Sequence, residues 1–243
     1  MTRQFELRRT VEVARSVEEV WQAVATVEGQ AAWRFPIGGE DAQAVGDLLF
    51  GHRVEILDPP HYLRLRAEEA DGQPDIIEYL VESQTTGVRL SYLHAGVIDD
   101  DDGEVHFEST AQHTDFYLHT LGQYLAHFSG KPVVYYGAEA PPAGAAPGSF
   151  ELLSADLGIA ADAVEGDEAS VGIQGVAPIR AVIDYRRPEF LGLRSSDALY
   201  RFFGRDVFAQ PVALGHHLFA GHLDEVLEEP AWRGWLDGLF SAD

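Results

Sequence analysis

The most constraining feature of this sequence is one long stretch with helical periodicity, residues 111–128 (AQHTDFYLHTLGQYLAHF). Apolar residues recur along it at intervals of three and four, which predicts an amphipathic helix with one buried face. Gly130 and Pro132 follow and are expected to end the helix. A helix of this kind needs an apolar surface to cover, and a curved antiparallel sheet supplies such a surface.

The residues before this helix predict that sheet. Five stretches are rich in apolar and alternating residues, as expected of half-buried strands. They cover residues 5–14, 47–57, 61–69, 76–84 and 87–97. The acidic run at 99–104 (DDDDGE) then predicts a solvated loop before the long helix.

A short helical segment interrupts the predicted strands after the first one. Ser16 and Glu19 have the spacing of a capping box, which predicts a helix start at this point. Gly29 is expected to end this helix as its C′ residue. A second helical turn ending at Trp33 follows, and Pro36 prevents its continuation.

The second half of the chain resembles an incomplete copy of the first. Residues 137–148 (GAEAPPAGAAPG) are rich in Pro, Gly and Ala, which is typical of a linker. We therefore predict a first domain at 1–134, a linker at 135–149 and a second domain at 150–243. The segments VEILDPPHYLRLRAE and AVIDYRRPEFLGLRSS share a strand, a proline-containing corner and a second strand. The alternative is two unrelated α+β units.

This repeat predicts what the second domain contains. It is expected to lack the first strand and the helix pair, with a short helix within residues 150–163 in their place. It is expected to end in an aromatic-rich helix at 224–240.

Composition excludes several classes of function. The 243 residues carry a formal net charge of −23, which disfavours binding to nucleic acid and to anionic membrane surfaces. The chain has no cysteine, so disulfides and thiolate metal sites are excluded. The polar N-terminus lacks the apolar core of a signal peptide, and no apolar run is long enough to span a membrane. These features predict a cytoplasmic protein without membrane insertion.

The order of these segments resembles the SRPBCC superfamily, which has the START/Bet v1-like helix-grip fold. Within it, the chain is most similar to the branch of the activator of Hsp90 ATPase, the AHSA1-like proteins. The pattern VWxAhT…eGhaxW of that branch, where h is apolar, is matched by Val20-Trp21, Ala23, Glu28-Gly29 and Ala32-Trp33. The segment TTGVRLSYLHAG matches another typical strand of the branch. The resemblance covers residues 5–134, and each motif in it is structural rather than catalytic.

The resemblance implies an α+β helix-grip fold, in which a curved antiparallel sheet wraps around the long helix, followed by a second, incomplete unit. It also implies a cavity between helix and sheet that binds a small hydrophobic or aromatic molecule without catalysis or cofactor. The alternatives are a filled core, a co-chaperone-like role with a protein partner or a homodimer, and an enzyme of the polyketide cyclase or hydrolase kind. The candidate cavity residues are Trp33, Tyr92, Phe116, Tyr117, Leu121, Tyr124 and Phe128.

Histidines are the remaining candidates for chemistry. Four of them, His94, His106, His113 and His119, fall around the last strand and the helix of the first domain. A histidine beside a carboxylate can act as a general base, and Asp115 and Glu78 are candidate partners by residue type. His216 and His217 are adjacent in a predicted strand and point to opposite faces, so together they do not form a metal site. No catalytic residue and no metal ligand is assigned.

Overall fold

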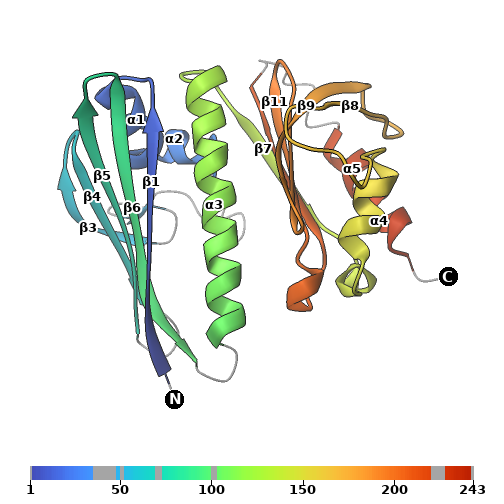
Figure 1. The fold of residues 1–243 in the computed structure, drawn as a ribbon, viewed down its shortest axis with the longest axis horizontal. Helices are drawn as coiled ribbons and strands as arrows, with labels where there is room; N and C mark the ends of the chain where they lie inside the picture. Colours follow the sequence, from blue (N-terminus) through green and yellow to red (C-terminus); the bar gives the residue numbers. More distant parts are fainter. Residues whose placement is uncertain are drawn as a thin grey trace. The chain divides into compact units, whose positions relative to one another are not determined.

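The computed structural model describes residues 2–34, 48–49, 52–68, 73–99, 103–219 and 228–241. The chain divides into two compact units, Met1–Gly130 and Lys131–Asp243 (Figure 1). Each unit combines one antiparallel sheet with helices, which gives the predicted α+β class.

The first unit contains the predicted strand–helix–helix–strands–helix order. Its sheet has the strand order β1-β6-β5-β4-β3-β2, and every neighbouring pair is antiparallel. Its elements are β1 (Thr2–Val13), α1 (Val17–Ala25), α2 (Val27–Ala31), β2 (Leu48–Leu49), β3 (His52–Asp58), β4 (Tyr62–Glu68), β5 (Pro74–Gln84), β6 (Gly87–Asp99) and α3 (Gly103–His127).

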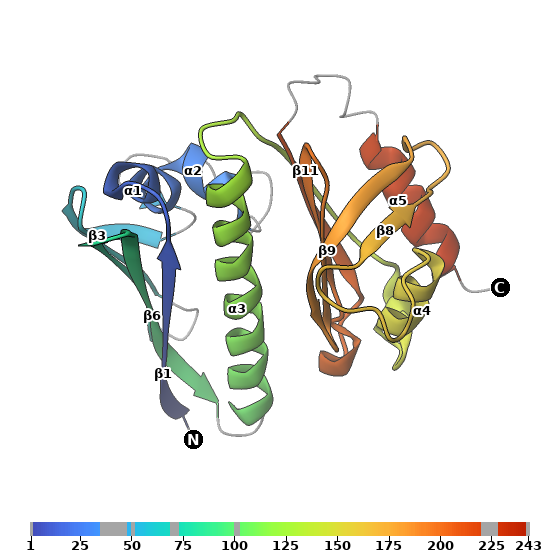
Figure 2. The same cartoon turned by 45° about the horizontal axis from the view of Figure 1, so that its top comes forward.

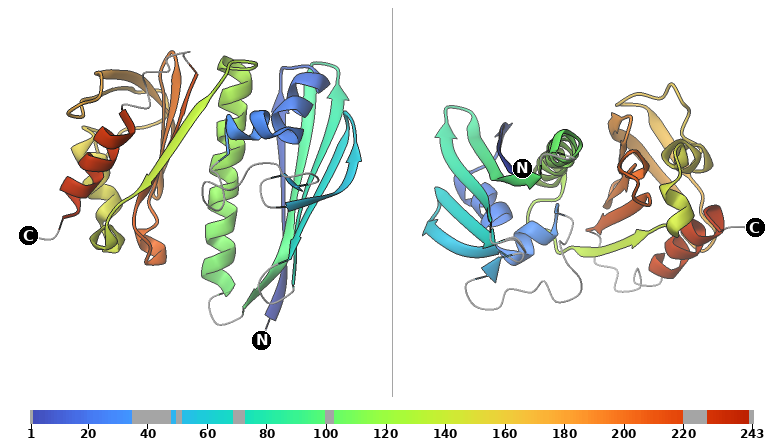
Figure 3. Two further views of the ribbon diagram at one scale, coloured as in Figure 1. Left: turned by 180° about the vertical axis from the view of Figure 1, so that it is seen from behind. Right: turned by 90° about the horizontal axis from the view of Figure 1, so that it is seen from below.

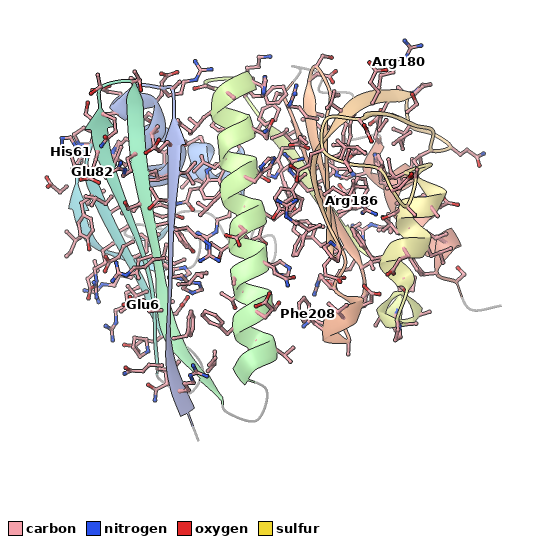
Figure 4. The ribbon with its side chains drawn as sticks, viewed as in Figure 1. Glu6, His61, Glu82, Arg180, Arg186 and Phe208 are labelled. Atoms are coloured by element: carbon pink, nitrogen blue, oxygen red, sulfur yellow. The ribbon has the colours of Figure 1, made fainter. Side chains whose placement is uncertain are left out.

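The two faces of this sheet differ in character. Alternate residues of the central strands point towards α3 and are buried; we call this side the inner face. The other side carries many charged side chains, and Glu6 and Glu82 lie there, away from α3 (Figure 4). The apolar inner-face residues with at most 2% exposure are Leu63, Leu65, Ile77, Tyr79, Val81, Val88 and Leu90.

The short helices α1 and α2 lie at one end of the sheet (Figure 3), and their backbones come into close contact at Gly29. The predicted capping box is confirmed, with Ser16 and Glu19 each accepting a hydrogen bond from the other's backbone N–H. Gly29, however, does not end the first helix, because α1 already ends at Ala25 and Gly29 lies within α2. A Cβ at Gly29 would lie 1.9 Å from the carbonyl oxygen of Gln22, so only glycine allows this approach.

The helix α3 is longer than predicted and covers the sheet over β1 and β6. It begins at Gly103, so residues 103–110 extend the predicted helix by two turns. Arg9 of β1 and Asp115 of α3 form an ion pair with two hydrogen bonds. At the other end, Arg15 donates to the carbonyl oxygens of Leu125 and Ala126, which have no partner within the helix.

The second unit has a sheet of its own with the order β7-β12-β11-β10-β9-β8. Figure 2 shows both of its α-helices on the same side of this sheet. Its elements are β7 (Val134–Glu139), the 3-10 helix η1 (Pro142–Ala145), α4 (Ser149–Asp156), β8 (Glu168–Val171), β9 (Ile179–Arg187), β10 (Phe190–Arg194), β11 (Ala198–Phe203), the 3-10 helix η2 (Asp206–Phe208), β12 (Ala213–Leu218) and α5 (Glu228–Leu239).

This arrangement repeats the topology of the first unit strand by strand. With β7 in the place of β1 and β12 in the place of β6, the two sheet orders are the same. The helical pair is also present, as η1 and α4. The expectation of an incomplete second unit is therefore wrong. The stretch 135–149, predicted to be a linker, contains most of β7, which pairs with β12 over six residues.

The core of the second unit lies between its sheet and the helices α4 and α5. The helices contribute apolar side chains to this core: Phe150 and Leu153 from α4, and Trp232 and Leu236 from α5. His216 of β12 lies in the same core, fully buried, with its ring 4.5 Å from that of Trp232. Of the predicted helix at 224–240, residues 224–227 lie outside the described part, and α5 covers Glu228–Leu239 of the rest.

Candidate functional site

The predicted cavity residues do not form one wall. Trp33 is 2% exposed, and its indole Nε1–H donates to the carbonyl oxygen of Ala23 at 2.9 Å. That oxygen belongs to the last turn of α1, where backbone acceptors lack helical partners. Trp33 therefore fixes the short helices to each other, whereas Tyr92 lies on the inner face of the sheet.

The predicted residues on α3 point in different directions. Thr114 faces the sheet, because its side chain hydrogen-bonds the hydroxyl of Tyr92. With about 100° per residue, Leu121 and Phe128 lie on the same side as Thr114, whereas Phe116 lies about 200° away. Tyr117 and Tyr124 lie at the border between these sides. The Tyr124 hydroxyl accepts a hydrogen bond from the Gly130 backbone N–H at 3.3 Å, which closes the C-terminal end of the helix.

The centre of the inner face is a pair of tyrosines. Tyr79 of β5 and Tyr92 of β6 are direct cross-strand partners, and their ring centroids lie 5.4 Å apart in an edge-to-face arrangement. Their exposures are 1% and 9%. Burial raises the pKa of both hydroxyls, so both stay protonated at neutral pH.

A buried cation lies near these tyrosines. Arg34, which follows Trp33, is 6% exposed, and its charge acts against the raised pKa of Tyr79 and of Tyr92. Its guanidinium donates to the side-chain oxygen of Gln30 at 3.3 Å, and Gln30 in turn donates to the carbonyl oxygen of Val24 at 2.5 Å. No carboxylate of the described residues lies within 4 Å of this guanidinium.

A histidine–carboxylate–histidine cluster occupies the next positions of the inner face. Asp75 of β5 accepts hydrogen bonds from Nε2 of His52 at 2.9 Å and from Nε2 of His94 at 2.6 Å. The side chains of these residues are 8–18% exposed. Burial alone raises the pKa of the Asp75 carboxyl, but the two hydrogen bonds and the histidine charges outweigh it and hold the pKa well below its usual value.

The structure gives the other ionisable candidates ordinary partners. Asp115 pairs with Arg9, and Glu78 pairs with Arg64 on the outer side of the sheet. His113 contacts the carbonyl oxygen of Ser109 at 2.8 Å, one turn earlier in α3. His94 contacts a carboxylate, that of Asp75.

Sequence reasoning missed Arg34, His52, Asp75 and Tyr79. The signal for Tyr79 was present, since it alternates with buried residues in a predicted strand. His52 and Asp75 lie 23 positions apart, and only the pairing of β3, β4 and β5 brings them together. Arg34 lies two residues after the C-cap residue of α2, and no sequence motif marks it.

The second unit offers a different kind of hollow. A pocket of about 450 Å³ is open to solvent at one end of its sheet. Its polar walls contrast with the mainly apolar lining of typical ligand sites. It is lined by Ala177, Pro178, Ile179, Arg180, Ser195, Ser196, Asp197, Ala198, Tyr200, Leu218 and Glu228.

Two further observations concern metals and membranes. Within the described ranges, no three His, Asp or Glu side chains are grouped so that they could hold a metal ion. None of the helices described is both long enough and apolar enough to span a bilayer.

Comparisons with known proteins give similarity of structure but not of sequence. No protein-family model matches the chain, and no curated protein matches it. The Aha1 dimer from Colwellia psychrerythraea is similar at 17% identity, over 50% of this chain and 96% of that chain, with a TM-score of 0.39. CalU16 from Micromonospora echinospora is similar at 19% identity, over 52% and 87%, with a TM-score of 0.38. DynU16, from the dynemicin biosynthetic locus, is similar at 18% identity over 96% of both chains, with a TM-score of 0.37.

Proposed function

We propose that the first unit binds a small aromatic molecule that carries a negatively charged or carbonyl oxygen, between α3 and the inner face of its sheet. The observation that carries this proposal is Arg34, a buried guanidinium with no carboxylate partner among the described residues. Tyr79 and Tyr92 supply aromatic surface for the ring of the ligand, and Arg34 supplies the charge for its oxygen.

The two units each contain a buried arginine, and the two arginines differ in their partners. Arg201 in the second unit is 1% exposed, and Asp184 neutralises it with two hydrogen bonds of 2.8 and 2.9 Å. Arg34 is buried to a similar degree, but its side-chain acceptor among the described residues is the amide oxygen of Gln30. Burying a charge without a counter-charge costs several kcal/mol. A ligand oxygen that pairs with Arg34 would recover that cost on binding.

The SRPBCC resemblance supports the same location, because helix-grip proteins bind small molecules between the long helix and the sheet. It includes the AHSA1-like branch, and the co-chaperone-like function of that branch remains the alternative. The second alternative, a cyclase or hydrolase, would use the His52–Asp75–His94 cluster for proton transfer.

Native mass spectrometry of the purified full-length protein tests this proposal. We expect a discrete bound mass that disappears under denaturing conditions, and a thermal shift with aromatic acids or phenols in a ligand panel. The Arg34→Met variant should lose both, whereas Arg233→Met, which changes an exposed arginine in the second unit, should keep both. A wild-type protein with no bound mass and no shift across the panel would contradict the proposal.

A further inference from the structure

The hydrogen bonds around Asp75 determine which histidine nitrogen carries a proton. The Asp75 carboxylate accepts from Nε2 of both His52 and His94, so each Nε2 bears a hydrogen. In a neutral imidazole the other nitrogen, Nδ1, then carries no hydrogen and has a free lone pair. This is the tautomer in which a carboxylate prepares a histidine to accept a proton at its far nitrogen.

The Nδ1 of His94 is available to a ligand. Among the described residues, the contacts of His94 are the hydrogen bond to Asp75 and an edge-to-face ring contact with Phe5, whose centroid is 5.1 Å away. Its side chain is 18% exposed. His94 therefore has one nitrogen fixed by the carboxylate and the other without a hydrogen-bond partner in the described chain.

His94 lies close to the proposed binding site. His94 and Tyr92 lie two residues apart on β6, so their side chains share the inner face about 7 Å from each other. The negative charge of Asp75 and the positive charge of Arg34 both act on the Tyr92 hydroxyl. A ring that lies against the tyrosine pair can thus direct a hydroxyl towards His94.

We propose that the first unit binds its ligand as a phenolate, with His94 accepting the proton of the ligand's phenolic hydroxyl. The O–H bond of the phenol breaks, its electron pair stays on the oxygen, and the proton bonds to Nδ1 of His94. Asp75 stabilises the resulting imidazolium, His52 holds Asp75 in place, and Arg34 stabilises the phenolate. This inference rests on the proposed function and deepens it by naming the ligand class.

The two tyrosines and the Arg9–Asp115 ion pair do not compete for this proton. Tyr79 and Tyr92 already carry theirs. Arg9 of β1 and Asp115 of α3 neutralise each other.

The test uses 4-nitrophenol, whose neutral and anionic forms absorb at different wavelengths. Equilibrium dialysis with the full-length protein measures how much probe binds. The absorption spectrum of the bound probe, recorded one pH unit below the probe's own pKa, measures how much of it is phenolate. Free probe is then about one-tenth phenolate, and we expect the bound probe to be mostly phenolate.

Two variants assign the effect to the cluster. His94→Gln should bind the probe mainly as the neutral phenol, with at least a tenfold lower ratio of phenolate to phenol, and Asp75→Asn should act in the same direction. His61→Gln, at the exposed turn between β3 and β4 (Figure 4), should behave like the wild type. Wild-type protein that binds neutral probe, or a His94→Gln variant that keeps the phenolate, would overturn the inference.

Absence of binding also overturns it, but separately from the proposed function. If native mass spectrometry shows a bound molecule while 4-nitrophenol does not bind, the first unit has a ligand site that does not take phenols. If neither experiment shows binding, both proposals fail.

Discussion

Arg34, which follows α2, and Asp75 of β5 carry opposite charges under different constraints. Asp75 is part-buried with a hydrogen-bond donor on each oxygen, so its charge is stabilised by the protein itself. Arg34 is more deeply buried and interacts with a neutral amide. The charge of Asp75, which the protein itself hydrogen-bonds, contributes to the stability of the fold. The charge of Arg34 lowers the stability of the fold but can strengthen the binding of an anionic ligand.

Replacement of Arg34 by methionine should therefore not destabilise the protein in the absence of ligand. We expect a free energy of unfolding that is unchanged or raised by about 1–2 kcal/mol, because the variant removes a buried charge that has no carboxylate partner in the described part of the chain and nearly keeps the side-chain volume. Arg201→Met is the matched control, since it leaves Asp184 buried without its partner and should cost about 3–5 kcal/mol. Urea denaturation measures both. A large loss of stability in Arg34→Met would show that Arg34 is a structural residue.

Asp75 should make the stability of the protein depend on pH in the acid range. Its pKa is lower in the folded state than the ordinary value of 3.8, so its contribution is fully present above about pH 4 and is lost as the pH falls further. Asp75→Asn should be less stable than wild type by about 1–3 kcal/mol at pH 6. The difference should shrink as the pH is lowered towards 2 in urea denaturation series. A difference that is independent of pH would contradict this assignment.

At the scale of single elements, local sequence patterns correctly predicted the features that depend only on residues close together in the sequence. The capping box at Ser16 and the alternation of β4 and β5 are of this kind, and the structure confirms these elements. The break between α1 and α2 was predicted at Gly29 but lies at Thr26, because Thr26 both ends one helix and caps the next. The His52–Asp75–His94 cluster could not be predicted, because it depends on the register between strands rather than on the spacing within one.

Two glycine substitutions separate a packing requirement from helix propensity. Gly29→Ala should destabilise the protein by about 1–3 kcal/mol, because its Cβ would overlap the backbone of α1 at Gln22. Gly122→Ala in α3 is the control, since its Cβ would have no heavy atom within 4 Å. It should stabilise the protein by up to about 1 kcal/mol through helix propensity. Chemical denaturation of both variants decides the matter, and equal effects would refute the close-packing argument.

At the scale of the whole molecule, the two units share one sheet topology. The amino-acid composition predicted the wrong starting residue for the second unit. Residues 137–148 have the Pro, Gly and Ala content of a linker, yet the first three belong to β7 and pair with β12. Tyr136 and Ala138 of this strand are buried in the core of the second unit. A short strand can consist of such residues when its partner supplies the hydrogen bonds, so composition alone misplaced the boundary.

Truncation tests where the second unit begins. We expect residues 131–243 to fold on their own, with a cooperative urea transition and the circular dichroism of a sheet, because all six strands are present. Residues 150–243 should not give a cooperative transition, because without β7 the strand β12 loses six cross-strand residue pairs and the core loses Tyr136 and Ala138. If both fragments fold equally well, β7 is dispensable and the boundary predicted from composition is the better one. If neither folds, the second unit depends on residues of the first, and the chain is one cooperative domain despite its two sheets.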